Sequence, residues 1–499
     1  MTRSYGNFIN GKFDMEGNRH ELKSPADGSV VASITMGSRE KTLEAIDAAY
    51  DSFHGKWLKT SLSERKALLS KLADRIMERS DEYAMLESLN TGKTIRQSML
   101  MDIPLGIDHI RYFATKGEFT GSRSIVHPEY PDTEGEIQYA PMGVVGSIAP
   151  WNVPFLMAVW KLAPALVAGN TVVLKPSHFT PLTALEMASD MKAVGFPDGV
   201  VNVITGDGST VGEALTASRK VSMISFTGST STGKKIMRDS SESIKKITLE
   251  LGGKSPNIVL DDCDIDHAVK GVMFGIYLNS GQLCESGSRL LVSSRIRDRF
   301  LARMKTYLEG MRVGSPMDME TDVSAITTEK QRQKISDLVE TGTGDGARVY
   351  YSKNMQGAPD MGLYFPPTIL TDVPPGSEVA REEIFGPVLS VSEFDTDEEA
   401  VKIANSSRYG LAAGVWSRNI KRARDIGSRL ESGTVWINEY HLLSAAAPRG
   451  GFKDSGVGRE LGTEGILEYT QTRHLFISRG KTDQDDVAYG LILGSQPSQ

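Results

Sequence analysis

Cysteine is scarce in this chain: 499 residues contain only Cys263 and Cys284. Two thiols cannot form a disulfide framework and are too few for a cysteine-based metal site, so we predict no metal centre and a reducing compartment. No apolar run approaches the roughly 18 residues of a membrane-spanning helix, and the N-terminus has no apolar core of signal-peptide length. These absences favour a cytoplasmic protein without a membrane partner.

Long runs of a single charge are also missing. The net charge of −7 comes from 56 Lys and Arg mixed with 63 Asp and Glu. This pattern excludes the basic footprint that nucleic-acid binding requires. The chain is too long for one hydrophobic core, and its length predicts roughly two to four domains.

A helix pattern stands out near the N-terminus. Ser61 opens a Ser-x-x-Glu capping box, and the residues that follow place apolar side chains on one stripe: Leu68, Leu69, Leu72 and Ile76. The pattern predicts an amphipathic helix that ends near Gly92.

From about residue 143, short β-branched runs alternate with helical segments: GVVGSIA, TVVLK, VVNVI and SMISF. Such strand-helix-strand units predict a parallel, doubly wound sheet. After the turn LELGGKSPN the alternation resumes to about residue 440, which indicates a second α/β domain. Strand patterns at 117–140 and in EYTQTRHLFIS fall outside both domains, and we expect them to pair with another subunit.

Cys284 lies in NSGQLCESGSR, where Gly and Ser would let the backbone approach a ligand. It is a candidate nucleophile, although a lone cysteine is as readily a buried structural thiol. Catalysis would need a base or a positive potential, since a free thiol is only a few per cent ionised near neutral pH. The acidic neighbours of Cys263 in VLDDCDID would raise the pKa of its thiol, so we interpret Cys263 as structural.

Two further residues could serve such a nucleophile. Glu250 lies between apolar residues in LELGGKSPN, where burial would raise its pKa and suit a general base; a salt bridge at a strand end is the alternative. Asn152 in APWNVPF follows a strand, and its amide could stabilise an oxyanion or merely cap the next helix.

Phosphate-binding signals are weak individually. FTGSTSTGKK follows a strand and opens a helix whose N-terminus could hold a pyrophosphate, but it has neither G-x-G-x-x-G nor Walker spacing. Lys175, in VVLKPSHFTP, ends another strand and could contact a ribose or a phosphate. An isolated Lys is more often a solvated surface residue.

Taken in order, these segments resemble the aldehyde dehydrogenase superfamily from FINGKF near the start to GVGRELG. The resemblance implies that Cys284 is the nucleophile, Glu250 the general base, and Asn152, with the Cys284 backbone amide, the oxyanion hole. It also implies binding of NAD or NADP by a set of cofactor residues: Trp151, Lys175, Ser177, His178, Gly208, Gly228, Ser229, Gln331, Lys334, Glu383 and Phe385. Phe385 would pack beside the nicotinamide.

The resemblance further implies a reaction and an architecture. An aldehyde would be oxidised to the acid through a Cys284 hemithioacetal and, after hydride transfer, a thioester that water hydrolyses with Glu250 as base. The fold would be α/β, with a Rossmann-like cofactor domain (1–119 and 141–251), a catalytic domain (252–445) and a β-strand oligomerisation arm (120–140 and 466–480). Homodimers or homotetramers are expected.

The chain departs from the family pattern beside Lys175. NAD-preferring relatives usually have Glu three residues later, where this chain has His178. Without that carboxylate, a 2′-phosphate would not be repelled and Ser177 could donate to it, so NADP is plausible. The alternative is that His178 faces solvent and NAD is still preferred.

The expected substrate residues depart as well: Val153, Met157, Trp160, Glu285, Leu443 and Arg449. Met157 and Trp160 keep an apolar wall, whereas Arg449 replaces a bulky aromatic. Arg449 could bind a carboxylate on the aldehyde, or it could pair with Glu285 or Glu439. The missing aromatics argue against a trimethylammonium cage of the betaine-aldehyde type.

Three alternatives remain open. A CoA-acylating semialdehyde dehydrogenase would not need Glu250. A non-catalytic family member acting as a binding protein would be expected to lack Cys284, Glu250 or Asn152. A cofactor-free thiol hydrolase would need a His in a recognisable dyad with the cysteine, and none is visible in the sequence.

Overall fold

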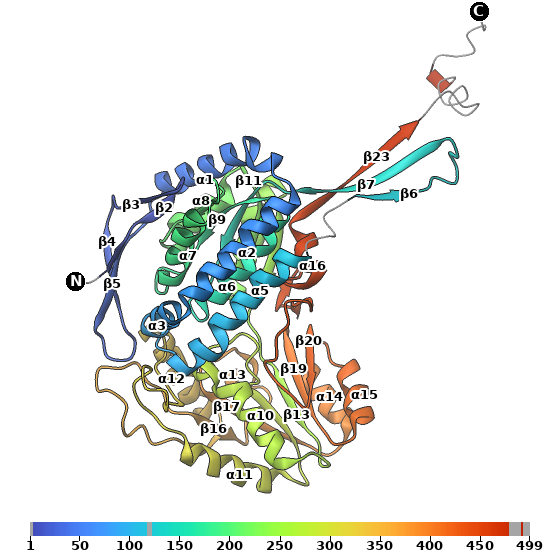
Figure 1. The fold of residues 1–499 in the computed structure, drawn as a ribbon. Coiled ribbons are helices and arrows are strands. Elements are labelled where there is room, and N and C mark those ends of the chain that lie inside the picture. The colour runs from blue at the N-terminus through green and yellow to red at the C-terminus, as the bar shows by residue number, and fades with distance from the viewer. Residues whose placement is uncertain (1–2, 117–121, 479–490, 493–499) are drawn as a thin grey trace, which may run out of the picture.

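The computed structural model describes residues 3–116, 122–478 and 491–492. Two α/β bodies, each built on its own sheet, lie one above the other in the view of Figure 1, and a strand arm projects from their side. The predicted α/β fold is confirmed.

The first sheet has eight strands in the order β22-β12-β11-β8-β9-β10-β2-β3. Its five central strands are parallel and include all four predicted runs: β8 (Val144–Ile148), β9 (Thr171–Lys175), β10 (Val201–Val203), β11 (Val221–Thr227) and β12 (Lys246–Glu250). β2 (Asn7–Ile9), β3 (Lys12–Asp14) and β22 (Gly456–Val457) complete it. The helices around this sheet include α1 (Arg39–His54), α6 (Pro154–Val167), α7 (Leu182–Ala193), α8 (Glu213–Ala217) and α9 (Thr230–Ser240).

The second sheet has seven strands in the order β15-β16-β17-β14-β13-β19-β20. Only its edge strand β15 (Arg348–Ser352) is antiparallel; the others are β13 (Pro256–Val259), β14 (Arg289–Ser293), β16 (Thr368–Thr371), β17 (Val388–Phe394), β19 (Ala412–Trp416) and β20 (Thr434–Ile437). Its helices include α10 (Ile265–Tyr277), α11 (Arg297–Gly310), α12 (Glu329–Gly344), α13 (Glu378–Arg381), α14 (Asp397–Asn405) and α15 (Ile420–Ser428). A short turn, η6 (Leu278–Gly281), follows α10.

The predicted arm is a three-stranded sheet. β7 (Thr133–Pro141) lies between β6 (Arg123–Ile125) and β23 (Thr470–Ser478), and both pairings are antiparallel. Figure 1 shows this sheet extending away from both bodies. Residues 120–121 and 479–480 of the predicted arm lie outside the described residues.

The predicted helix between Ser61 and Gly92 is in fact two helices. The capping box is formed as predicted: Ser61 accepts from the Glu64 amide, and Glu64 accepts from the Ser61 amide. The helix α2 (Leu62–Glu78) ends at Arg79, whose φ of -112° and ψ of 16° break the helical path before α3 (Ser80–Thr91) begins. Gly92, with φ of 80°, then ends α3 in a left-handed conformation that glycine adopts without strain.

In the first body, α5 (Ile103–Lys116) packs against α2 and α6, and η2 (Ser98–Asp102) packs against α3 and α5. Within the described part of the chain, no helix combines the length and apolarity that crossing a bilayer would need. The same part of the chain has no group of three or more His, Cys, Asp or Glu side chains placed to hold a metal ion.

Candidate active site

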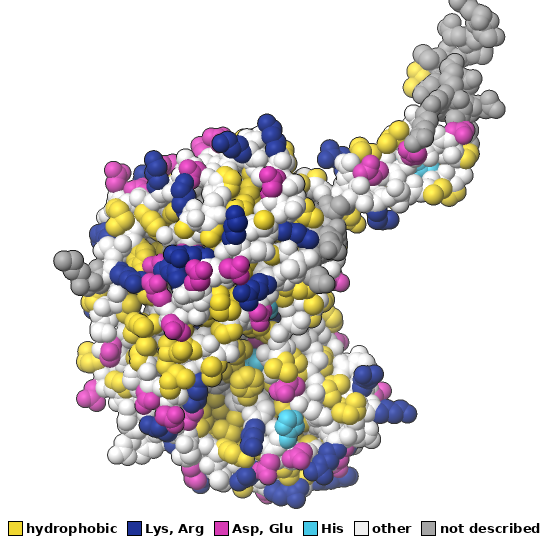
Figure 2. Space-filling view, in the orientation of Figure 1, with side chains coloured by type: hydrophobic (Ala, Val, Ile, Leu, Met, Phe, Trp, Pro, Cys, Tyr) yellow, Lys and Arg dark blue, Asp and Glu magenta, His cyan; other side chains and the backbone are white. Residues whose placement is uncertain are grey.

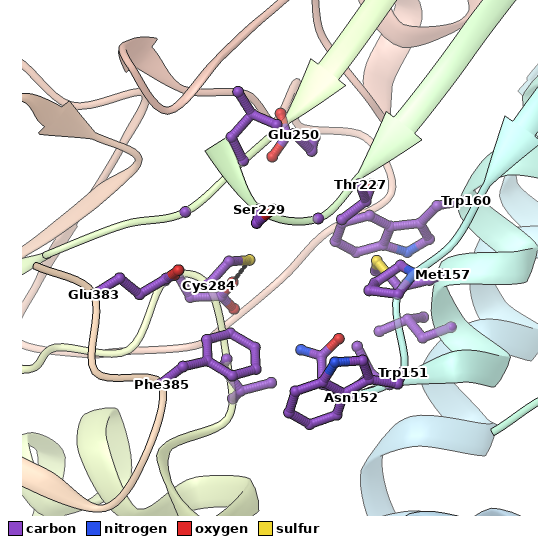
Figure 3. Close-up of a pocket in the computed structure, with 18 of the residues that line it drawn as sticks. Trp151, Asn152, Met157, Trp160, Thr227, Ser229, Glu250, Cys284, Glu383 and Phe385 are labelled. Carbon is purple, nitrogen blue, oxygen red and sulfur yellow. Dashed lines mark hydrogen bonds between the residues drawn. The ribbon is translucent and has the colours of Figure 1, made fainter. Parts of the chain in front are cut away.

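One pocket brings the three predicted catalytic residues together between the two sheets. Cys284, Glu250 and Asn152 all line it. Glu250 is the last residue of β12, Asn152 follows β8, and Cys284 lies in the second body, between η6 and β14. In Figure 3, Cys284 lies between Glu250 and Asn152, with Glu383 and Phe385 on one side and Met157 and Trp160 on the other.

The turn before Cys284 has an uncommon backbone conformation. Asn279 and Ser280 both have a backbone φ of 51°, a left-handed value that residues other than glycine rarely adopt. Two hydrogen bonds hold the turn: the Asn279 backbone amide donates to Gln97 Oε1 at 3.1 Å, and Ser280 Oγ donates to the Ser324 carbonyl at 3.0 Å. Such local strain persists only where surrounding contacts fix it, and here it positions the cysteine.

Cys284 is a neutral thiol in this arrangement. Burial, and then the neighbouring Glu285 carboxylate, raise the pKa of the Cys284 thiol well above its ordinary value. Sγ donates to Glu285 Oε2 at 3.3 Å, and Arg449 Nη2 lies 3.7 Å from Sγ. Attack on a carbonyl therefore requires removal of the thiol proton first.

Glu285 and Arg449 form a buried ion pair beside the nucleophile. Glu285 Oε2 accepts from Arg449 Nη2, and Glu285 Oε1 lies 3.2 Å from His441 Nδ1. Burial alone would raise the pKa of Glu285, but Arg449 and His441 hold it well below its ordinary value. Of the alternatives left open for Arg449, the contact with Glu285 is the one present, whereas Glu439 accepts from the Tyr440 amide.

The amide of Asn152 is fixed by one hydrogen bond. Nδ2 donates to the Gln282 carbonyl at 2.8 Å, and Asn279 Nδ2 donates to the Asn152 carbonyl at 3.1 Å. Asn152 is buried, and its Oδ1 has no hydrogen-bond partner within the described chain. An amide nitrogen carries two hydrogens, so one N–H remains for a ligand.

Glu250 is buried at the opposite wall. Burial raises its pKa to about 8, helped by the nearby Glu460 and opposed by Arg449 and Lys161. Glu460 is itself paired with Lys161 Nζ at 2.5 Å, and Lys161 also donates to Ser225 Oγ at 3.1 Å. Glu250 Oε1 has no partner among the described residues, so its carboxyl group is available to a ligand or a water.

The predicted cofactor residues fall into two groups. The first lines the pocket with Cys284: Trp151, Gly228, Ser229, Gln331, Lys334, Glu383 and Phe385. Ser229 caps α9 by accepting from the Thr232 amide, and the Trp151 and Phe385 rings meet edge to face at 5.3 Å. From α12, Gln331 Nε2 donates to the Phe385 carbonyl at 3.0 Å and Lys334 Nζ to the Glu383 carbonyl at 2.8 Å.

The second group lies outside that lining, at the ends of β9 and β10: Lys175, Ser177, His178 and Gly208. His178 does not simply face solvent, because its side chain is only 21% exposed and Nδ1 lies 3.6 Å from Asp207 Oδ1. Burial lowers the pKa of His178, and burial lowers that of Lys175 to about 8, while Asp207 opposes both shifts.

The predicted substrate residues all line the pocket: Val153, Met157, Trp160, Glu285, Leu443 and Arg449. Trp160 Nε1 donates to His109 Nδ1 at 2.7 Å, and the Arg449 guanidinium lies 5.3 Å from the centre of the Trp160 ring. Cys263 lies elsewhere and is buried; burial, and then Asp262 and Asp264, raise its pKa to about 11.

Several site residues were missed by the sequence reasoning. Glu460 lies in GVGRELG, where the resemblance to the family ends. Its position near Glu250 depends on the pairing of its backbone with that of Arg449, which the local sequence does not indicate. Gln97 and Met101 come from the irregular segment around η2. Nothing in their local sequence singles them out.

A thiol, an amide and a carboxyl group in one pocket between two largely parallel sheets form a set of groups that suits an α/β enzyme of the covalent-catalysis class. Comparison with known proteins narrows the class: the pattern of the aldehyde dehydrogenase family matches residues 13–475. The chain belongs to the aldehyde dehydrogenase family, and aldehyde oxidation is its class of reaction.

Its relatives are similar over nearly their full length. The chain is 40% identical to the betaine aldehyde dehydrogenase of Bacillus subtilis (strain 168), covering 94% of this chain and 96% of the relative. It is 42% identical to an aldehyde dehydrogenase of Emericella nidulans, covering 94% of each. A crystal structure of betaine aldehyde dehydrogenase from Staphylococcus aureus in complex with NAD+ superposes with a TM-score of 0.94 at 37% identity, covering 97% of this chain and 96% of that one.

Proposed function

We propose that this enzyme oxidises an aldehyde to the carboxylic acid with a nicotinamide cofactor, through a thioester on Cys284. The observation that carries the proposal is the meeting of Cys284, Asn152 and Glu250 in one pocket from three separate segments of the chain. Each residue type suits one part of the reaction: a nucleophile, an oxyanion donor and a base.

In the first half of the reaction, Cys284, which is only partly buried, would first lose its thiol proton to water. The thiolate would then attack the carbonyl carbon, and the carbonyl oxygen would become an oxyanion. The free N–H of Asn152 and the Cys284 backbone amide would hold that oxyanion. Preorganised donors of this kind lower the barrier because they are already aligned where the charge develops.

The cofactor would lie against the residues that share the pocket with Cys284. Glu383 suits a ribose because its Oε1 accepts from the Gly253 amide at 3.0 Å and a carboxylate can accept from hydroxyl groups. A Cβ atom at position 252 would lie 2.6 Å from Glu383 Oε2, so the glycine there leaves room beside this oxygen. A bound nicotinamide cofactor supplies the oxidant that accepts the hydride.

In the second half, Glu250 would take a proton from water, which then attacks the thioester and releases the acid and the thiol. A pKa near 8 makes Glu250 an adequate base around that pH. This buried carboxyl group favours hydrolysis over the alternative of transfer to CoA, which would not use it. A non-catalytic binding role would not require the three groups to meet.

Between the two cofactors, we propose a preference for NAD over NADP. Two structures of relatives, from Staphylococcus aureus and Bacillus cereus, contain NAD+. In this chain the Asp207 carboxylate lies beside His178 and Lys175, where it would repel a 2′-phosphate in place of the missing glutamate.

We further propose a cytoplasmic homodimer or homotetramer that assembles through the arm. The two cysteines are both free, which suits a reducing compartment. Apolar side chains on the arm are exposed, among them Val126 at 84% and Phe476 at 50%. We also propose a cofactor domain of residues 1–119 and 141–251, a catalytic domain of 252–445 and an arm of 120–140 and 466–480. The separate sheets support this division, and β22 joins the sheet of the cofactor domain.

The decisive experiment follows cofactor reduction at 340 nm with purified enzyme, an aldehyde and NAD+, in the absence of CoA. We expect turnover that Cys284→Ala abolishes and Cys263→Ala preserves. Full dehydrogenase activity in Cys284→Ala would contradict the assignment of the nucleophile. A strict requirement for CoA would replace hydrolysis by acyl transfer.

A further inference from the structure

We propose that the substrate is an uncharged aldehyde with an apolar body, and that Glu285 and Arg449, because they pair with each other, leave no free charge to bind a charged aldehyde. This inference rests on the proposed function and names the substrate class of the same site. It separates this chain from its relatives whose names contain betaine aldehyde, which carries a permanent positive charge.

The first step is that Glu285 and Arg449, the two charged groups in contact with the Cys284 sulfur, already have each other as partners. Glu285 and Arg449 are 5% and 4% exposed and bond directly to each other. The second Glu285 oxygen faces His441 Nδ1, and the His441 Nε2 atom lies 3.1 Å from the Gly275 carbonyl. A substrate carboxylate that took Arg449 would leave Glu285 buried without its main partner, which is strongly unfavourable.

The second step concerns the aromatic ring on the same wall. A quaternary ammonium group is recognised by the face of an aromatic ring. The Arg449 guanidinium lies over the Trp160 ring, 5.3 Å from its centre, and Trp160 is 3% exposed. The ring is therefore engaged by an internal cation, and a cationic aldehyde would meet a guanidinium where it needs a π face.

The third step is the approach to the site. A second cavity, next to the first, shares Gln97, Met101 and Leu443 with it. Its walls carry exposed apolar side chains: Leu100 at 71%, Leu442 at 64% and Phe274 at 37%. Figure 2 shows hydrophobic side chains gathered across the middle of the molecule, between the two bodies.

The charged groups of this second cavity do not select a charged ligand. Arg96 is paired with Asp322 at 2.5 Å, and Asp108 is exposed to solvent. An apolar wall whose charges are either paired or solvated favours a neutral, apolar ligand, since burying apolar surface is favourable and burying an unpaired charge is costly.

The test compares charged aldehydes with neutral aldehydes of the same shape. One pair is trimethylammonioacetaldehyde and 3,3-dimethylbutanal; the other is 4-oxobutanoate and 4-oxopentanal. Rates are expressed as kcat/KM for the free carbonyl form, whose fraction is measured by NMR because the compounds hydrate to different extents. We expect each neutral aldehyde to exceed its charged counterpart by about tenfold or more, which corresponds to roughly 1.4 kcal/mol of discrimination.

Three variants test whether the pairing of Glu285 with Arg449 keeps both charges from binding a charged aldehyde. Glu285→Gln leaves Arg449 unpaired and should raise the relative kcat/KM for 4-oxobutanoate, whereas Arg449→Gln leaves Glu285 unpaired and should raise it for trimethylammonioacetaldehyde. The double variant is neutral at both positions and serves as the matched control, with the preference for neutral aldehydes retained. A loss of activity common to all substrates cancels in these ratios.

The outcomes separate the two proposals. A charged aldehyde that matches or exceeds its neutral counterpart in the wild-type enzyme overturns the inference but leaves aldehyde oxidation intact. Equal ratios in all three variants show that the pair does not set the preference and overturn its role. No turnover of any aldehyde with either cofactor overturns the proposed function and the inference with it.

Discussion

Asn152 Nδ2 donates to the main-chain carbonyl of Gln282, two residues before the nucleophile, at 2.8 Å. This bond ties the first body to the turn that carries Cys284, and it fixes the plane of the Asn152 amide. The second N–H of the amide is left for a ligand. The amide is thus oriented before a substrate arrives, which is what an oxyanion donor requires.

Removal of this donor should slow the chemical step. We expect Asn152→Ala to lower kcat by roughly 10²- to 10³-fold, because one oxyanion donor typically contributes that much. The affinity for the cofactor, measured by fluorescence titration, should change little. Asn152→Asp keeps the shape but removes the donor, so it should lose activity similarly; full activity in Asn152→Asp would show that the amide hydrogen is not used.

Ionisation of Glu250 should govern deacylation. Its pKa is raised to about 8, so the carboxylate that acts as base is present above pH 8 and is lost as the pH falls through 8. We expect the rate constant for deacylation, measured by stopped-flow after a burst of cofactor reduction, to rise with pH through a midpoint at about 8 and to level off at higher pH.

Substitution of the same residue gives an independent readout. Glu250→Gln should accumulate the acyl-enzyme, seen by mass spectrometry as a mass increase on the peptide that contains Cys284. Rapid turnover of Glu250→Gln with no adduct on Cys284 would contradict the role of Glu250 in hydrolysis.

The strands and the capping box were predictable because they depend on local sequence. Ser61 and Glu64 are three residues apart, and the runs that form β8 to β11 carry their own β-branched pattern. The break at Arg79 was not predictable in the same way. Arg79 is a residue type that is common within helices, so its identity does not mark the break. Its guanidinium contacts Asp190 and Glu186, which are over 100 positions away and therefore not visible in the local sequence.

The same division applies to the site. Cys284, Glu250 and Asn152 could be proposed because their motifs match those of a family in order along the chain. The contact between Arg449 and Glu285 could not be predicted from sequence, because Glu439 is an equally suitable partner by residue type. In the structure Glu439 instead accepts from the Tyr440 amide. Glu460 and Asp207 act through neighbours distant in sequence, and no local pattern marks them.

Glu460 should tune the base. Its negative charge is one cause of the raised pKa of Glu250, second to burial. Glu460→Gln removes this charge and also frees the positive charge of Lys161, so both effects stabilise the Glu250 carboxylate and lower its pKa. We expect the midpoint of the deacylation pH profile to move below 8. Glu468→Gln, at a partly exposed carboxylate that pairs with Lys246, makes the same change in net charge and should leave the midpoint in place.

If Glu460→Gln leaves the midpoint unchanged, the charge of Glu460 is not sensed by the group that titrates. If the midpoint rises, the sign of the coupling is wrong, because loss of the Glu460 charge and release of the Lys161 charge should both lower the pKa of Glu250. The amplitude of the burst of cofactor reduction counts the active sites that complete the first half of the reaction. An unchanged amplitude in Glu460→Gln would therefore show that the variant is folded and that either result concerns the base.

Asp207 should set the choice between NAD and NADP. Its carboxylate is 59% exposed and lies 3.6 Å from His178 Nδ1, so its repulsion of a 2′-phosphate is screened by solvent. We expect Asp207→Asn to raise the affinity for NADP+ relative to NAD+ by about fivefold, measured by calorimetric titration, which reads binding independently of turnover. Asp198→Asn, a similarly exposed carboxylate paired with Lys192, is the matched control and should leave the ratio unchanged.

The neighbouring histidine adds a pH dependence of known sign. Burial lowers the pKa of His178, so its ring is neutral at pH 7 and becomes positive only as the pH falls. A positive ring next to the ribose site attracts a 2′-phosphate, so the affinity for NADP+ relative to NAD+ should increase toward low pH in the wild-type enzyme. His178→Gln should abolish that increase, and His178→Glu should reduce NADP+ affinity at every pH. An affinity ratio that is independent of pH in the wild-type enzyme would place the 2′-hydroxyl away from His178, and the choice of cofactor would then depend on another part of the cleft.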